Sequence, residues 1–206
     1  MSLRKALPIC LAALLALSLA PLATGARAAS VTYSLPLGVS PYLGASPYTY
    51  PAAASSFLKF DAAGQCLTSV CLRLDATAAG YVGLENTSAS PTIVPGALVG
   101  AVTVARPDLT PLISVQPGIP FSAGLQAFDG TVDYAGVSGV TLNGLSANLV
   151  GTLCLTSPAD LALFSGPGTI SLPCLATNAS TQAGAGSWTF AVQSVVVLEV
   201  TYNFDE

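Results

Sequence analysis

The chain has 206 residues, no histidine and only 8% charged residues, against about 25% in an ordinary soluble domain. The lack of histidine excludes the common Ser-His-Asp and Cys-His catalytic machinery and all histidine-based metal sites. After residue 28, three cationic side chains stand against ten acidic ones, which gives a net charge of −7. Such a charge balance argues against nucleic acid and anionic membrane surfaces as partners.

The first 28 residues have the three parts of a secretory signal peptide. Arg4 and Lys5 provide the positive start, an apolar run covers 9–20, and residues 26–28 match the A-x-A cleavage pattern. The run holds 12 residues, short of the roughly 20 needed to span a bilayer, so we expect no transmembrane segment in the mature chain. Residues 29–206 are long enough for one domain with a proper core.

Alternation of apolar and polar residues dominates this mature chain, and proline and glycine separate the alternating segments. In chain order, strands are expected at 31–35, 67–76, 97–104, 112–115, 121–128, 146–157 and 187–202. A single short helical turn is expected at 157–164. The pattern predicts an all-β fold, a single β-sandwich with jelly-roll-like antiparallel topology.

Two segments lack the strand pattern. Residues 40–51 repeat Ser-Pro-Tyr and contain three prolines, which predicts an extended connection rather than a central strand. Residues 176–187 contain only small and polar side chains, which predicts a loop before the last strand.

Four cysteines follow the signal peptide, and an even number in an exported chain predicts two disulfides with three alternative connectivities. In an extended strand, Cys66 and Cys71 lie roughly 16 Å apart, whereas a disulfide needs Cα atoms within about 7 Å. A bridge between these two is therefore disfavoured. Strand parity favours Cys71–Cys154, because both lie on polar faces, and Cys66–Cys174 is then the second pair. Zinc binding by the thiols is a poor alternative without histidine or a C-x-x-C motif.

Asp129 and Asp133 form the one close acidic pair in a suggestive setting, the stretch AFDGTVDYAGVSG at 127–139. An aspartate followed by glycine is first of all a turn, in which the carboxylate accepts backbone N–H groups. Calcium binding through carboxylate and carbonyl oxygens is the alternative. Carboxylate-based catalysis is the third interpretation, and it requires two acids about 5 to 9.5 Å apart in a sugar-binding cleft.

Four aromatic residues are candidates for stacking on sugar rings. They are Tyr42, Tyr48, Tyr50 and Trp188. Tyrosines beside prolines more often pack a crossing loop onto a sandwich, with the hydroxyl at the surface, and a lone tryptophan near a strand end usually belongs to the core. Packing is therefore the favoured interpretation. Asn86 and Asn178 match the N-glycosylation acceptor pattern, a match that a chain this rich in Ser, Thr and Asn produces by chance.

Three segments, in this order, resemble the bacterial choice-of-anchor E domain: FDAAGQCLTSVCLRLDA at 60–76, AFDGTVDYAGVSG at 127–139 and LEVTYNF at 198–204. The resemblance covers nearly the whole mature chain. It implies an exported β-rich protein of the cell surface or extracellular matrix, related to PEP-CTERM-type anchored proteins, with no catalytic residues to carry over. It also implies that the 127–139 segment is a fold-defining turn. This chain shows no PEP-CTERM-like or sortase-type tail after Phe204, so release into the medium is expected.

Together these features predict a secreted structural or interaction protein without an enzymatic activity or a cofactor. The periplasm is the alternative compartment. Its partners are expected to be surface or matrix polysaccharides or proteins, including other copies of itself, since a surface poor in charge favours association. A carbohydrate- or calcium-binding module is the second hypothesis, and a carboxylate-based hydrolase the third.

We predict that cleavage follows Ala28. Mass spectrometry of the exported protein should give a chain that begins at Ala29. A chain that retains Met1, or that begins beyond Val31, would contradict the assignment of the signal peptide.

Overall fold

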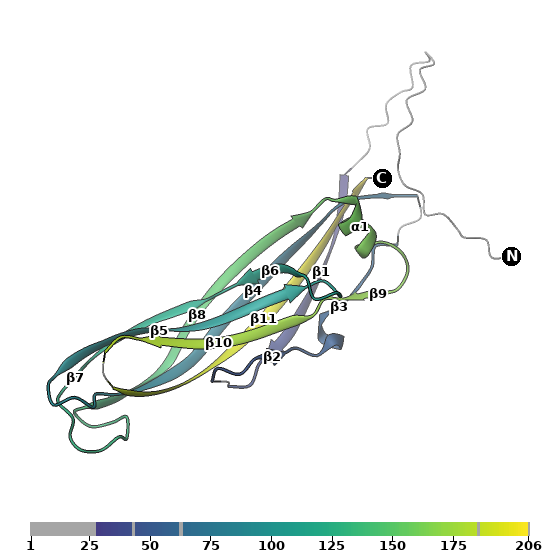
Figure 1. Cartoon of the computed structure of the whole chain (residues 1–206). Helices are drawn as coiled ribbons and strands as arrows, with labels where there is room; N and C mark the ends of the chain where they lie inside the picture. Colours follow the sequence, from purple (N-terminus) through teal and green to yellow (C-terminus); the bar gives the residue numbers. More distant parts are fainter. Residues whose placement is uncertain (1–27, 43, 62–63, 185, 206) are drawn as a thin grey trace, which may run out of the picture.

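The computed structural model describes residues 28–42, 44–61, 64–184 and 186–205, and shows two antiparallel sheets packed into an elongated sandwich (Figure 1). The first sheet has the order β1-β11-β4-β8, with bounds Ala28–Val39, Ser187–Asp205, Cys66–Glu85 and Gly139–Leu155. The second has the order β2-β10-β5-β6, with bounds Tyr48–Thr49, Cys174–Gln182, Thr92–Ala105 and Pro111–Val115. β7 (Gly118–Leu125) also pairs with β5. The predicted signal peptide lies outside the described residues except for Ala28, the first residue of β1.

Strand pairing is nested along the chain. β1 pairs with β11, β2 with β10, β4 with β8, and β5 with both β6 and β7. The short strands β3 (Ser56–Leu58) and β9 (Thr169–Ser171) pair with each other between these. A chain that pairs its first strand with its last, its second with the last but one, and so on inward is a long hairpin rolled into two sheets. This is a jelly roll, and the predicted fold class is confirmed.

One predicted loop is in fact a strand. The expected loop at 176–187 is wrong over most of its length, because β10 pairs with β5 from Cys174 to Gln182. Its inward side chains are small or neutral (Cys174, Ala176 and Asn178), and all three are buried. The strand has alternating burial, but its inward positions hold no large apolar side chain, so its composition resembles that of a loop. Conversely, the predicted strand at 121–128 ends at Leu125.

The other elements agree with the sequence. The described residues of 40–51 lead from β1 in the first sheet to the second sheet, and two of them form β2. The predicted helical turn is α1 (Pro158–Phe164), and Ala52–Ser55 adds one 3₁₀ turn, η1. Ser157 caps α1 by accepting a hydrogen bond from the Asp160 backbone N–H. Among the described residues, no helix has the length and apolar character needed to cross a membrane.

The core between the sheets consists of two apolar clusters. The cluster near the chain termini is built around buried side chains such as Leu72, Phe164 and Tyr202, and the cluster near the opposite end around Val82, Leu98 and Val192. Burial of Tyr202 raises the pKa of its hydroxyl to about 12, and the hydroxyl donates to the carbonyl oxygen of Leu58 at 2.8 Å. Each cluster receives side chains from both sheets, which joins the layers.

A polar seam separates the two clusters at the point where β1 leaves β11. The last register pair is Val39 with Val195, so the next backbone groups of β11 would be unpaired. Ser40 replaces the missing strand: its N–H donates to the Ser194 carbonyl at 2.9 Å, and its hydroxyl accepts the Ser194 N–H at 2.8 Å. The Tyr50 hydroxyl donates to the same carbonyl at 2.7 Å. Burial raises the pKa of Tyr50, which keeps this hydroxyl protonated as a donor.

Asn178 completes the seam from the second sheet. Its side-chain N–H donates to the Val192 carbonyl of β11 at 2.8 Å, so this buried amide is part of the core. Gly100 of β5 lies beside it, and a side chain there would meet Ala78 at 2.9 Å. The seam therefore closes one edge of the sandwich with neutral hydrogen bonds.

One of the two predicted disulfides is correct. Cys71 of β4 and Cys154 of β8 are register partners with Cα atoms 4.0 Å apart, and they form a disulfide. The second, Cys66–Cys174, is wrong, because Cys174 is a buried free thiol. Cys174 points into the core from the second sheet, whereas Cys66 lies exposed at the start of β4 in the first sheet. Burial raises the pKa of the Cys174 thiol to about 12.

Replacing Cys71 and Cys154 together with serine should lower the free energy of unfolding by roughly 2–5 kcal/mol, measured by urea denaturation. In the native protein Cys174 should resist alkylation, because it is buried and protonated. Non-reducing peptide mapping should recover the 71–154 pair. A recovered 66–174 pair would contradict the assignment.

Candidate functional site at the loop end of the sandwich

The segment 126–138 connects β7 to β8 at the end of the molecule opposite the chain termini (Figure 1). Both aspartates of this segment are turn-makers, as predicted. A carboxylate oxygen of Asp129 accepts the Thr131 N–H at 3.0 Å, and one of Asp133 accepts the Ala135 N–H at 3.0 Å. These are local Asx turns.

The centre of this loop end is Glu85, the last residue of β4. Its side chain is 1% exposed, and its carboxylate accepts the Tyr134 N–H at 2.8 Å and the Ser138 hydroxyl at 2.6 Å. None of the cationic side chains in the described ranges forms an ion pair with it. A buried carboxylate without a cation needs such donors, so Glu85 and the loop fix each other. We call this arrangement the Glu85 clasp.

Asn86, which follows Glu85, extends the clasp to the neighbouring segments. Its backbone N–H donates to the Ser138 carbonyl at 2.8 Å. Its side-chain amide donates to the carbonyls of Ser90 at 2.9 Å and Gln126 at 2.6 Å, and its side-chain oxygen accepts the Ser88 N–H at 2.9 Å. Asn86 is fully buried, and its one side-chain amide links the loop after β4 to the loop after β7.

The small and unusual residues of 127–139 follow from this packing. Gly130 and Gly136 have φ of +101° and +72°, the left-handed region that favours glycine. Gly139 lies against Glu85 and the backbone of Ala135 with no room for a side chain. Tyr134 itself has φ of +57°, and its hydroxyl lies 3.2 Å from that of Ser187.

The ring of Tyr134 also lies over a glycine of β4. A side chain at Gly83 would meet Cγ of that ring at 3.0 Å. The sequence did not point to Glu85 or Gly83, and it pointed to Asn86 only as a match to the glycosylation acceptor pattern. The one local signal for the clasp is an acid and an amide directly after a long strand rich in apolar residues.

The four candidate aromatic residues do not gather in one cleft. Tyr50 is 2% exposed and belongs to the seam, with Tyr48 packed edge-on against it at 5.0 Å between ring centroids. Tyr42 is 57% exposed and lies 6.4 Å from the ring of Tyr81 on β4. Trp188 is 45% exposed at the loop end, where its indole N–H donates to the Ser180 hydroxyl at 3.2 Å. The expectation of a core tryptophan is therefore wrong, because the sheets end beside it.

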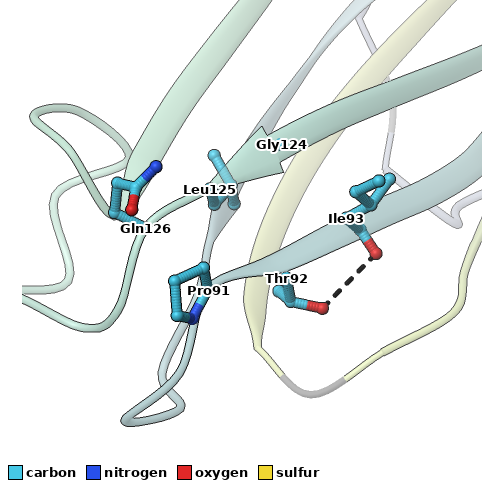
Figure 2. Close-up of a pocket in the computed structure, with 6 residues that line it drawn as sticks. All are labelled: Pro91, Thr92, Ile93, Gly124, Leu125 and Gln126. Atoms are coloured by element: carbon cyan, nitrogen blue, oxygen red, sulfur yellow. Dashed lines mark hydrogen bonds between the residues drawn. The ribbon is translucent and has the colours of Figure 1, made fainter.

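Two depressions of the surface are candidate binding sites, and none of these four residues lines either. Figure 2 shows the first, which lies at the loop end between the start of β5 and the end of β7. It has no titratable side chain. Its lining residues are Pro91, Thr92, Ile93, Gly124, Leu125 and Gln126. The second lies near the termini, where Tyr33, Phe60 and Phe204 meet the side chains of Lys59 and Asp61. The second combines aromatic and polar groups, and the sequence analysis did not identify it.

Within the described ranges, no three or more His, Cys, Asp or Glu side chains come together as a metal site would require. One oxygen of Asp129 and one of Asp133 are occupied by turn hydrogen bonds. The loops after β4 and β7 are therefore held together by hydrogen bonds at the end of the sandwich opposite the chain termini.

No family model and no curated protein matches the chain. Among solved structures it is similar to that of the infectious bursal disease virus Gx strain, at 14% identity and a TM-score of 0.32, over 86% of this chain and 36% of the other. It is also similar to the VP2 subviral particle of that virus, at 13% identity and a TM-score of 0.29, over 85% and 41%. The chain thus spans about two fifths of the length of these proteins. The fold assignment rests on the strand pairing alone.

Replacing Glu85 with alanine should destabilise the protein strongly, because each buried donor left unpaired costs about 1–3 kcal/mol. Asp129→Ala should cost about 1 kcal/mol, as for a lost cap. The control is Glu199→Ala, which removes a carboxylate from an exposed ion pair with Arg73 worth about 0–1 kcal/mol. Urea denaturation measures all three.

Thermal unfolding with millimolar calcium and with chelator tests the calcium alternative. We expect the same melting temperature for the wild type in both conditions. A rise of several degrees that disappears in Asp133→Asn would make 127–139 a metal site, because a ligand specific to the folded state stabilises it.

Proposed function

We propose that the protein is an exported structural or interaction protein of the cell surface or extracellular matrix and that it has no catalytic role. The observation that carries the proposal is the Glu85 clasp. In the clasp, both oxygens of a buried carboxylate accept hydrogen bonds from segment 126–138 and hold that segment at the end far from the termini. Loops that are fixed by hydrogen bonds and lie far from the chain termini suit contact with a partner molecule.

The exposed face of the first sheet supports the same role. Its side chains form hydrogen-bonded rows across strands, such as Thr32 with Thr201 at 2.8 Å and Asn148 with Thr77 at 3.0 Å. The charged residues Arg73, Asp75 and Glu199 pair with one another within this face. A face of hydroxyls, amides and ion-paired charges suits many weak contacts with polar polymers.

Membership of the choice-of-anchor E family is part of this proposal. The clasp gives a physical reason for the most distinctive segment of the resemblance: 127–139 supplies two Asx turns, the Tyr134 and Ser138 donors, and Gly139 against Glu85. The matched segment 198–204 lies in β11, which pairs with β4. These two of the three matched segments thus serve the fold.

A carbohydrate-binding module is the second candidate, and the depression near the termini favours it. Phe60 and Phe204 lie 4.9 Å apart between ring centroids, beside the polar side chains of Lys59 and Asp61. Aromatic faces with adjacent hydrogen-bonding groups suit sugar rings.

Fractionation of the source cells with an antibody to the mature chain tests the proposal. The protein should be in the envelope or the medium, without residues 1–28, and a deletion strain should lose adhesion or matrix cohesion while growth is unchanged. A full-length protein in the cytosol would overturn the proposal. Calorimetry of the mature protein with a panel of polysaccharides separates the candidates: heat lost in Phe60→Ala and kept in Tyr42→Ala would favour the sugar-binding module.

A further inference from the structure

The edge strands of the two sheets differ in how far they are protected against pairing with another chain. Proteins protect edges with prolines, charged side chains, bulges or short length. β1 has Pro36 and a register irregularity after it, and β2 has two residues. β6 and β7 are short and contain Pro111 and Pro120. β8 is the edge strand of the first sheet, and its 17 residues include neither a proline nor a charged side chain.

The direction of the backbone groups of β8 follows from the disulfide partners. The Cα atoms of Cys71 and Cys154 are 4.0 Å apart, which marks a non-hydrogen-bonded pair of an antiparallel ladder. The N–H and C=O of Cys154 therefore point away from β4. Register with β4 is unbroken from Leu155 back to Leu145, so every second residue repeats this orientation. The residues with outward backbone groups are Ser146, Asn148, Val150, Thr152 and Cys154.

We propose that β8 pairs with the β8 of a second copy of this chain, antiparallel and around a two-fold axis at Val150. Residue 150 is the centre of the unbroken segment 145–155, and it belongs to the set whose backbone groups point outward. Pairing around it places Asn148 opposite Thr152 and Ser146 opposite Cys154. The two four-stranded sheets then form one continuous eight-stranded sheet through an isologous contact.

The self-complementary register of β8 favours a second copy as the occupant, because segment 145–155 pairs with itself around Val150 and places polar side chains opposite polar ones. Elsewhere the net charge of −7 makes two copies repel each other, which confines the contact to an uncharged strand. β8 has no charge, so contact there brings no like charges directly opposite each other. Leu149 and Val150, which are 44% and 39% exposed, would become covered. This inference supplies a partner for the proposed structural role and rests on that role only for its biological setting.

A matched pair of lysine variants tests the pairing by sedimentation of the purified mature protein over a range of concentrations. Val150→Lys puts two charges opposite each other at the axis and should weaken the dimer at least about ten-fold, since such juxtaposition costs several kcal/mol. Val195→Lys is the control. Val195 is 38% exposed on the same face of the sheet, but it lies on β11, between β1 and β4, and its change should leave the dimer intact.

A second variant and a second measurement guard against an effect on folding. Thr152→Pro removes an N–H that points to the edge, not to β4, so the monomer should fold and the dimer should be lost. In the wild type, exchange of the Asn148, Val150 and Thr152 amide hydrogens should slow as protein concentration rises. A wild type that is monomeric at all concentrations, or equal effects of the two lysines, would overturn the pairing. A monomer that is still exported to the cell surface would overturn only this inference.

Discussion

The long antiparallel pairing of β4 with β11 is the interaction on which the rest of the molecule depends. It runs from Cys66 opposite Asp205 to Glu85 opposite Ser187, the full length of the sandwich. Both apolar clusters contain inward side chains of these two strands, and β1 and β8 add to their outer edges. Because β4 and β11 are far apart in sequence, forming this pair closes most of the chain into one loop. The pairs that β5 forms with β6, β7 and β10 close shorter loops within it.

The polar features of the interior lie at two places along this central pair, where β1 leaves β11 and where β4 ends. β1 ends at Val39 while β11 continues, and Ser40, Tyr50 and Asn178 take over its backbone partners. At the other end, β4 finishes in Glu85, whose carboxylate and the adjacent Asn86 collect the donors and acceptors of two loops. A long strand pair in a sandwich leaves backbone groups exposed wherever a flanking strand stops, and neutral side chains satisfy them here.

How far the sequence predicted this structure depends on whether the relevant signal was local. Alternation identified β11, the first half of β4 and the second half of β8, and with them the parity of Cys71 and Cys154, because large apolar residues mark the inward face there. β10 was missed because its inward positions hold small and neutral residues. The fold class was predictable, whereas nested strand order depends on pairings between distant segments that no local pattern contains.

The candidate site was predictable only in part for the same reason. The Asx turns of Asp129 and Asp133 are local, and the sequence identified them. Glu85 and Ser138 are 53 residues apart, and their hydrogen bond exists only after β8 has paired with β4. Asn86 and Asn178 match an acceptor pattern for sugars, yet both amides are buried and engage backbone carbonyls. A motif of three residues cannot distinguish an exposed amide from one that closes a core.

The ion pairs of this protein contribute little to the stability of its fold. The described ion pairs join Arg73 to Asp75 and Glu199, and Arg106 to Asp160; the hydrogen bond from Arg106, with help from Ser157, lowers the pKa of Asp160. All of these lie toward the surface, where salt screens them and they contribute little. Stability therefore comes from burial between the sheets, from neutral hydrogen bonds at the seam and from the hydrogen bonds that the Glu85 side chain accepts at the loop end. The ion pairs of this protein therefore contribute less to its stability than the buried strand pairs and the hydrogen bonds between them.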